Sequence, residues 1–229
     1  MRLGNRLNCI ATYVPQNAKL ADVGTDHAYL PIYLVENEQI DFAIATDIVQ
    51  GPCEAAKKSV EKYTLQNKIS VRQGDGLSSV NKGEIDTVVV AGMGGSSIVD
   101  ILAKGSEVLL AVTTLVLQPM TEGFLLRKWL CENNWLITNE DLVVEGERLY
   151  EIIVTKKGVA KQLNNIELLV GPILLKKGHV LLKKHFQNII DRYDFICRSM
   201  ENSPSAVASA KYKEYKCLLN ELKERLQCL

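Results

Sequence analysis

Three acidic residues follow three successive apolar stretches of the chain, and their side chains are the first candidates for chemistry. Asp22, Asp47 and Asp75 each come at or just after the end of a stretch that is typical of a buried strand. In a parallel sheet the carboxyl ends of such strands meet at one edge, where ligands bind. A carboxylate at the second end can accept hydrogen bonds from both hydroxyls of a ribose. A carboxylate or a backbone amide at the third strand end suits an adenine ring. The order of the three acidic residues along the chain therefore indicates a nucleotide-like ligand.

The turn after the first stretch, Gly24-Thr-Asp-His-Ala-Tyr29, narrows the kind of ligand. It lacks the G-x-G-x-x-G pattern of dinucleotide-binding turns, and the chain has no G-x-x-x-x-G-K-[ST] phosphate loop. Gly24 has no side chain, so a ligand can approach the backbone there. Asp22 and Asp26 flank the turn, and two carboxylates disfavour a pyrophosphate. A cofactor with a sulfonium and an α-ammonium suits them better, which favours S-adenosylmethionine over NAD.

The elements that would position these residues alternate between strand and helix. Apolar stretches predict strands over residues 19–24, 42–48, 69–72, 86–91, 113–117, 135–144 and 150–155. Helical spacing predicts helices over residues 2–13, 28–37, 51–63, 95–104 and 122–133. Such alternation predicts a mostly parallel, Rossmann-like sheet with helices on both faces. The last two strands are joined through Glu145-Gly-Glu147, which predicts a hairpin and one antiparallel strand in an α/β fold.

The pattern changes after Lys156-Lys-Gly158. Gly171-Pro172 interrupts a short helix, and residues 179–200 and 206–227 carry apolar side chains every three to four positions. These two long helices, joined by a short loop in which Ser203 or Ser205 can cap the second helix, predict an antiparallel hairpin, or coiled coil. We therefore predict one domain over residues 1–158 and a helical domain over residues 159–229.

Charge is unevenly distributed along a chain of 229 residues whose formal net charge is zero. From residue 160 onward there are 12 Lys and Arg against 7 Asp and Glu, so the tail is basic and the remainder acidic. A basic tail suits a polyanionic partner, although a solvated helical face would look the same. The candidate contacts to nucleic-acid phosphates are Arg2, Arg6, Arg127, Lys176, Lys177, Lys183 and Lys184.

Cysteine spacing and hydropathy bear on the compartment. None of the six cysteines forms a C-x-x-C pair, and no spacing suits a zinc site, so we expect no metal. The first residues lack the apolar core of a signal peptide, and no stretch offers the roughly 20 apolar residues that cross a bilayer. We expect a reduced cytoplasmic protein that acts away from membranes, as a monomer, with dimerisation through the hairpin left open.

Five segments together resemble one enzyme family. They are Asp22-Val-Gly-Thr-Asp-His-Ala-Tyr-Leu-Pro31, Gln73-Gly-Asp-Gly76, Ala91-Gly-Met-Gly-Gly95, Leu117-Gln-Pro119 and Arg148-Leu-Tyr-Glu151. The chain resembles, over its whole length, the bacterial tRNA (adenine-22-N1)-methyltransferases. The resemblance implies a class I methyltransferase fold with an added helical hairpin, and transfer of a methyl group from S-adenosylmethionine to N1 of an adenine in the tRNA D-loop. Met120 departs from the pattern, because we expect Asn after Gln-Pro.

Strand ends and resemblance together define the candidate residues. Those for the cofactor are Asp22, Gly24, Asp47, Ile48, Gly74, Asp75, Gly76, Ala91 and Gly92. Those for the tRNA substrate are Tyr29, Met93, Gly94, Gln118, Pro119, Arg2, Arg6 and Arg127.

The candidates for catalysis are Asp26 and His27. Methylation of adenine N1 leaves a cationic base, and a carboxylate nearby would stabilise the developing charge. Asp26 is the first candidate, with the alternative that it holds the methionine part of the cofactor. His27 can instead hydrogen-bond the base or the methionine carboxylate. Tyr29 can stack on a base, although core packing explains it as well.

Other functions remain open at this point. A methyltransferase on the same fold can act on another RNA base, on a protein or on a small molecule, but a small substrate needs no basic helical arm. A non-catalytic adaptor that works through its hairpin would need no intact cofactor pocket. Gly24, Asp47 and Asp75 are all present, which favours an enzyme.

Overall fold

The computed structural model describes residues 1–229 and divides them into two compact units, Met1–Gln162 and Leu163–Leu229. The predicted boundary after residue 158 lies just before the division, in the segment that follows the last strand. Each unit is described by itself.

The first unit is built on one seven-stranded sheet in the order β3-β2-β1-β4-β5-β7-β6. Its strands are β1 (Lys19–Val23), β2 (Phe42–Asp47), β3 (Ile69–Gln73), β4 (Thr87–Gly94), β5 (Thr114–Thr121), β6 (Trp135–Glu145) and β7 (Arg148–Lys157). The first five pair in parallel, whereas β7 pairs antiparallel with both β5 and β6. The prediction of a mostly parallel sheet with one antiparallel strand is therefore confirmed.

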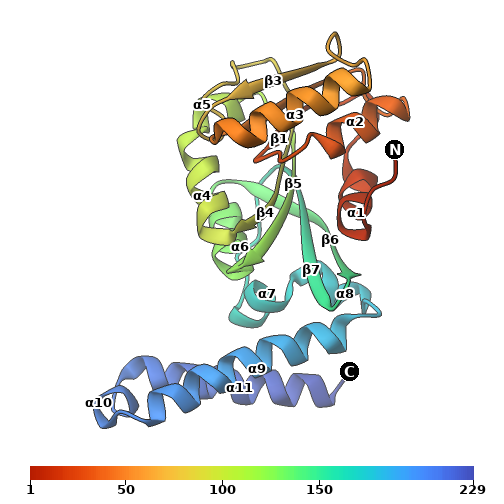
Figure 1. The fold of residues 1–229 in the computed structure, drawn as a ribbon. Helices are drawn as coiled ribbons and strands as arrows, with labels where there is room; N and C mark the ends of the chain where they lie inside the picture. The colour runs from red at the N-terminus through yellow and green to blue at the C-terminus, as the bar shows by residue number, and fades with distance from the viewer. The chain divides into compact units, whose positions relative to one another are not determined.

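Helices cover both faces of this sheet (Figure 1). They are α1 (Asn5–Tyr13), α2 (Tyr29–Glu36), α3 (Gln50–Lys62), α4 (Gly95–Lys104), α5 (Ser106–Leu109) and α6 (Gly123–Glu132). On one face, α1, α2 and α3 bury Ile10, Leu34 and Val60 against strand residues such as Val89 and Val116. On the other, α4 and α6 pack on β4, β5 and β6. Fully apolar central strands are expected where both faces are covered.

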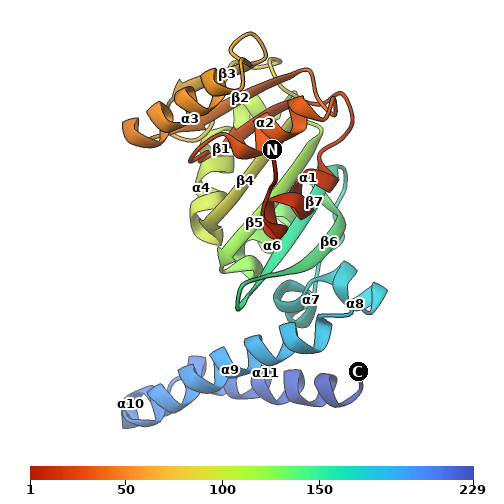
Figure 2. The same cartoon turned by 45° about the vertical axis from the view of Figure 1, so that its right-hand side comes forward.

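Strands β4 and β5 are longer than the sequence predicted. They extend to Gly94 and Thr121, and their pairing shifts register around Met93. Gly92 adopts φ +79°, a left-handed conformation that glycine takes without steric cost. Because β1, β2, β4 and β5 pair in parallel, their carboxyl ends lie at the same edge of the sheet (Figure 2).

The second unit is helical, with α7 (Asn165–Val170), α8 (Pro172–Lys177), α9 (Leu182–Glu201), α10 (Pro204–Val207) and α11 (Ala210–Gln227). Helices α9 and α11 lie side by side as the predicted antiparallel hairpin (Figure 1), with Tyr193 and Tyr215 in edge contact. The single helix predicted over 206–227 is wrong at its start. Ser203 and Ser209 each cap a helix, so the chain forms α10 first and α11 begins after Ser209.

Two absences bear on membranes and metals. No helix of the structure combines the length and apolar character that crossing a membrane requires. No group of three or more His, Cys, Asp and Glu side chains is arranged to hold a metal ion.

Candidate active site

The turn after β1 is held by its own backbone and by β2. The amides of Gly24 and Thr25 both donate to the Thr46 carbonyl, at 2.8 and 2.9 Å. The Thr25 hydroxyl accepts from the Ala28 amide at 3.1 Å, which joins the turn to α2. Gly24 has φ +77°, and a side chain here would collide with the Met93 methyl group. Glycine is therefore required where the β1 turn and the end of β4 approach each other.

Asp22 is a buried carboxylate, with 8% of its surface exposed. Burial raises the pKa of Asp22 to about 6, against the opposing effects of a hydrogen bond with Thr25 and the positive charge of Arg6. A buried carboxylate with a raised pKa gains free energy when a cation binds beside it. The residue predicted to face a cationic cofactor thus has the electrostatic property that this role needs.

Asp47 is the last residue of β2, and only one of its two carboxylate oxygens is engaged in a hydrogen bond within the protein. Its Oδ1 accepts from the Val49 amide at 2.8 Å, which fixes the side chain in a tight turn. Oδ2 has no protein partner and can accept hydrogen bonds from a ligand. Beyond it, Ile48 and Val49 are 60% and 56% exposed, an apolar surface beside the carboxylate. The pair of features suits the ribose and base of a nucleoside.

The turn after β3 places its backbone, rather than its carboxylate, toward β2. Gly74 donates to the Asp47 carbonyl at 2.9 Å, and the Thr46 hydroxyl donates to the Gly76 carbonyl at 3.2 Å. The Asp75 carboxylate instead accepts from Lys104 of α4 at 3.0 Å. Of the two contacts to adenine that the sequence left open, this pairing favours the backbone one.

The last part of β4, from Ala91 to Gly94, is held by a buried glutamine. Gln118 Oε1 accepts from the Gly92 amide at 3.1 Å and from Arg6 Nη1 at 2.8 Å. Gln118 and Pro119 are buried, so neither presents a free side chain to a substrate. Gln118 Nε2 contacts the Pro119 carbonyl and the Met120 sulfur, so Met120 packs on the Gln118 amide.

Asp26, His27 and Tyr29 form the outer wall of the β1 turn. The carboxylate of Asp26 is 78% exposed and lies 3.5 Å from His27 Nε2. The His27 ring stacks on Tyr29, with centroids 5.0 Å apart and an angle of 14° between the rings. Tyr29 is 44% exposed, so the structure does not bury it in the core. The three side chains can therefore meet a base that enters from solvent.

The predicted phosphate contact at Arg127 is wrong. Its side chain is fully buried on α6, with Nε 2.7 Å from Glu140 and Nη2 2.7 Å from Glu151. Burial alone would lower the pKa of Arg127, but the two glutamates raise it above its usual value. The helical spacing that exposes Lys128 turns Arg127 inward, which a count of basic residues does not reveal. Arg2, by contrast, is exposed.

Four residues of the site were missing from the sequence-based candidates. Thr25 and Thr46 supply the hydrogen bonds that fix the turns. Glu145 accepts from the Arg6 amide at 3.2 Å, and the Tyr150 ring lies 5.6 Å from the Arg6 guanidinium. Tyr150 stands in the segment Arg148–Glu151 that carried the resemblance, which is the one signal that marked it.

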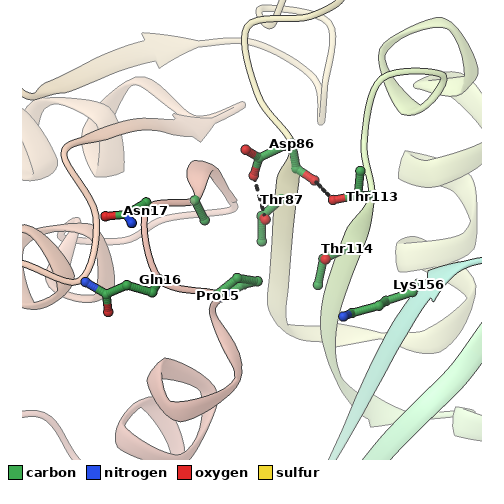
Figure 3. A pocket seen from close by; sticks show the side chains of 9 residues that line it. Pro15, Gln16, Asn17, Asp86, Thr87, Thr113, Thr114 and Lys156 are labelled. Atoms are coloured by element: carbon green, nitrogen blue, oxygen red, sulfur yellow. Dashed lines mark hydrogen bonds between the residues drawn. The ribbon is translucent and has the colours of Figure 1, made fainter.

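A pocket of about 260 Å³ lies at the opposite edge of the sheet (Figure 3). It is lined by Asp86, Thr87, Thr113, Thr114 and Lys156, from the amino ends of β4 and β5 and the carboxyl end of β7. Thr87 and Thr113 hydrogen-bond to Asp86. None of the candidate residues lines this pocket.

The donor set at the carboxyl edge fits S-adenosylmethionine. A buried carboxylate at Asp22 suits a cation, the open Oδ2 of Asp47 suits ribose hydroxyls, and Gly24 leaves the backbone accessible. The turn has no lysine or arginine that would favour a phosphate. The residues present therefore match a cationic nucleoside better than a dinucleotide.

Comparison with known proteins gives the family. A family model described as tRNA (adenine(22)-N(1))-methyltransferase matches residues 20–224. The chain is 38% identical to the Bacillus subtilis (strain 168) tRNA (adenine(22)-N(1))-methyltransferase over 100% of this chain and 96% of the relative.

Solved structures of such enzymes share the whole fold. The B. subtilis m1A22 tRNA methyltransferase TrmK has a TM-score of 0.84 and 34% identity over 99% of this chain and 96% of that one. M. capricolum TrmK in complex with S-adenosyl-homocysteine has a TM-score of 0.84 and 29% identity over 99% of both chains. The match of fold and sequence over nearly the full length shows that the chain belongs to the tRNA (adenine(22)-N(1))-methyltransferase family.

Proposed function

We propose that the protein transfers a methyl group from S-adenosylmethionine to N1 of adenine 22 in tRNA. The observation that carries the proposal is the pair of carboxylates at adjacent strand ends, the buried Asp22 and the half-open Asp47. Family membership supports the choice of tRNA and of the nucleotide. The M. capricolum relative holds S-adenosyl-homocysteine, described as the natural cofactor product.

The chain's own residues hold and orient the two reactants. Asp47 accepts hydrogen bonds from the ribose hydroxyls of the cofactor, and the backbone of residues 74–76 contacts its adenine. The β1 turn, with Asp22, holds the amino-acid part of the cofactor. When bound, S-adenosylmethionine supplies an electrophilic methyl group on its sulfonium. Adenine N1 lies on the Watson–Crick edge, so the target base must first leave any pair or stack.

The target base enters beside Met93, Gly94 and the outer wall of the β1 turn. Neutral adenine N1 already carries a lone pair, so positioning contributes more than proton removal. Asp26 stabilises the positive charge that develops on the base, because its carboxylate is exposed on that wall. His27 and Tyr29 form one stacked unit that can lie against the base.

The test is nucleoside mass spectrometry of tRNA from cells that lack the protein. We expect loss of N1-methyladenosine and its return when the gene is restored. Purified protein should also bind S-adenosylmethionine in calorimetry and methylate a tRNA transcript with adenine at position 22. A transcript with guanine there should stay unmodified, and methylation of that transcript, or of another base, would contradict the proposed target.

A further inference from the structure

Arg6 lies inside the carboxyl edge of the sheet although it stands on the first helix. Its Nη1 donates to Gln118 Oε1 at 2.8 Å, and its guanidinium lies over the Tyr150 ring at 5.6 Å. Its backbone amide donates to Glu145, whose carboxylate also lies 4.0 Å from Arg6 Nε. The side chain is 23% exposed. These contacts hold the guanidinium in one place.

Through Gln118, Arg6 is also linked to the last part of β4. Gln118 Oε1 accepts from Arg6 and from the Gly92 amide at once, so one buried oxygen links α1 to the Gly92 turn. A side chain at position 92 would lie 3.6 Å from Arg6 Nη1, which shows that the guanidinium rests beside this turn. Arg6 therefore supports the part of β4 that borders both the cofactor and the target base.

Arg6 also supplies positive charge to Asp22. Asp22 is buried, its hydrogen-bond partner is Thr25 of the same turn, and Arg6 from α1 is the charged group that acts on it. Without that charge, the carboxylate would be more costly to ionise in its buried position. One guanidinium thus contacts Gln118 and also lowers the pKa of Asp22 through its positive charge.

We propose that Arg6 is a positioning residue, which holds the last part of β4 around Gly92 through Gln118, and that it does not contact a tRNA phosphate. The inference rests on the proposed function, because that function places the cofactor and the target base beside this part of β4. It replaces the sequence-based expectation for Arg6, whose guanidinium is enclosed by three side chains. Arg2, four residues earlier, is exposed and keeps the expected role.

The test compares Arg6→Met with Arg6→Lys and with Arg2→Met as the matched control. Both methionine variants remove one positive charge from the same N-terminal segment, but only Arg6→Met removes the contact with Gln118 and the charge that lowers the pKa of Asp22. We measure S-adenosylmethionine affinity from about pH 5 to about pH 8, tRNA affinity at several salt concentrations, and thermal unfolding of the protein without cofactor over the same pH range.

Arg6→Met should weaken S-adenosylmethionine binding by about 10-fold across this pH range, because Gln118 and Gly92 lose the group that holds them. The pH midpoint of the remaining affinity should move upward, since the positive charge that lowers the pKa of Asp22 is removed. The unfolding temperature of this variant should change with pH over a correspondingly higher range, while the salt dependence of tRNA binding stays that of the wild type. Arg6→Lys keeps the charge and should keep the midpoint. Arg2→Met should leave the midpoint unchanged and reduce the salt slope by about one.

Two outcomes overturn the inference. One is an S-adenosylmethionine affinity of Arg6→Met equal to that of the wild type, and the other is a smaller salt slope in Arg6→Met, with or without a change in cofactor affinity. Failure of the wild-type protein to bind S-adenosylmethionine would contradict the proposed function instead. The two failures are therefore distinguishable within one set of measurements.

Discussion

At the scale of single residues, the two carboxylates proposed to recognise the cofactor differ in burial, and so their replacement should have different effects. Asp47 has one free oxygen at the surface of the edge, and its removal should affect only ligand binding. We expect Asp47→Ala to weaken S-adenosylmethionine binding by about 10- to 100-fold, the value of one or two hydrogen bonds to a charged group. Calorimetry measures this effect, and unchanged tRNA affinity in a gel-shift assay is the control.

Asp22 should show a pH effect, since its pKa is about 6 when folded and about 4 in an unfolded chain. The folded protein holds this proton more tightly, so wild-type stability should fall as pH rises from about 4 to about 6. Asp22→Asn removes the titration. It should be more stable than the wild type at neutral pH, by on the order of 2 kcal/mol, and bind cofactor weakly. Urea unfolding measures the stability of both proteins. The same stability difference between wild type and Asp22→Asn at about pH 4 and at neutral pH would contradict this assignment.

Asp26 is exposed and makes no contact that the fold depends on, apart from His27. We expect Asp26→Asn to reduce the methylation rate by about 10- to 1000-fold through weaker electrostatic stabilisation, with little change in tRNA or cofactor affinity. Single-turnover methylation measures the chemical step. His27→Ala is the matched variant from the same turn, and a larger fall in rate there than in Asp26→Asn would move the catalytic role to His27.

At the scale of elements, strand and helix periodicity predicted the sheet, and local hydrogen bonding decided what it missed. The seven strands and their alternation with helices follow from apolar spacing. The extension of β4 and β5 past Ala91 and Leu117 depends on bulged pairing around Met93, which has no periodic signal. The break between α10 and α11 depends on the cap at Ser209, a residue that the apolar stripe passes over.

The candidate site likewise has features that the sequence predicted and features that it did not. Acids at strand ends were predictable, because chain order places them at one edge. The burial of Arg127 and the link from Arg6 to Gln118 were not, because both depend on side-chain contacts between different elements. From sequence alone, a basic residue on a predicted helix is interpreted as a surface charge, because the carboxylates that pair with it in the fold are not known.

Helix α6 depends on Arg127 for its attachment to β6 and β7. Arg127→Met would leave Glu140 and Glu151 without this cation in a buried place, which typically costs about 3 to 5 kcal/mol. We expect a matching fall in the free energy of urea unfolding. The exposed neighbour Lys128→Met is the control and should change stability little. Equal stability of both variants, with weaker tRNA binding in Arg127→Met, would restore the phosphate contact that the sequence suggested.

At the scale of the whole molecule, the charge asymmetry assigns different tasks to the two units. The first unit is acidic in balance and carries carboxylates that suit a cationic cofactor. In the second, several basic side chains already have acidic partners, as in the pairs of Lys216 with Glu201 and of Lys223 with Asp194. The lysines of α8 and of the start of α9 are exposed and form a basic surface that can meet a polyanion.

We propose that this surface, made of Lys176, Lys177, Lys183 and Lys184, binds tRNA phosphates. Replacing all four with alanine should lower tRNA affinity and reduce the slope of log affinity against log salt by about one for each phosphate that is no longer neutralised. Cofactor affinity should stay unchanged, because every residue proposed to hold the cofactor lies in Met1–Gln162. Lys223→Ala, which breaks a pair with Asp194, is the control and should keep the wild-type slope. An unchanged slope in the fourfold variant would show that phosphates are bound elsewhere, with Arg2 as the next residue to replace.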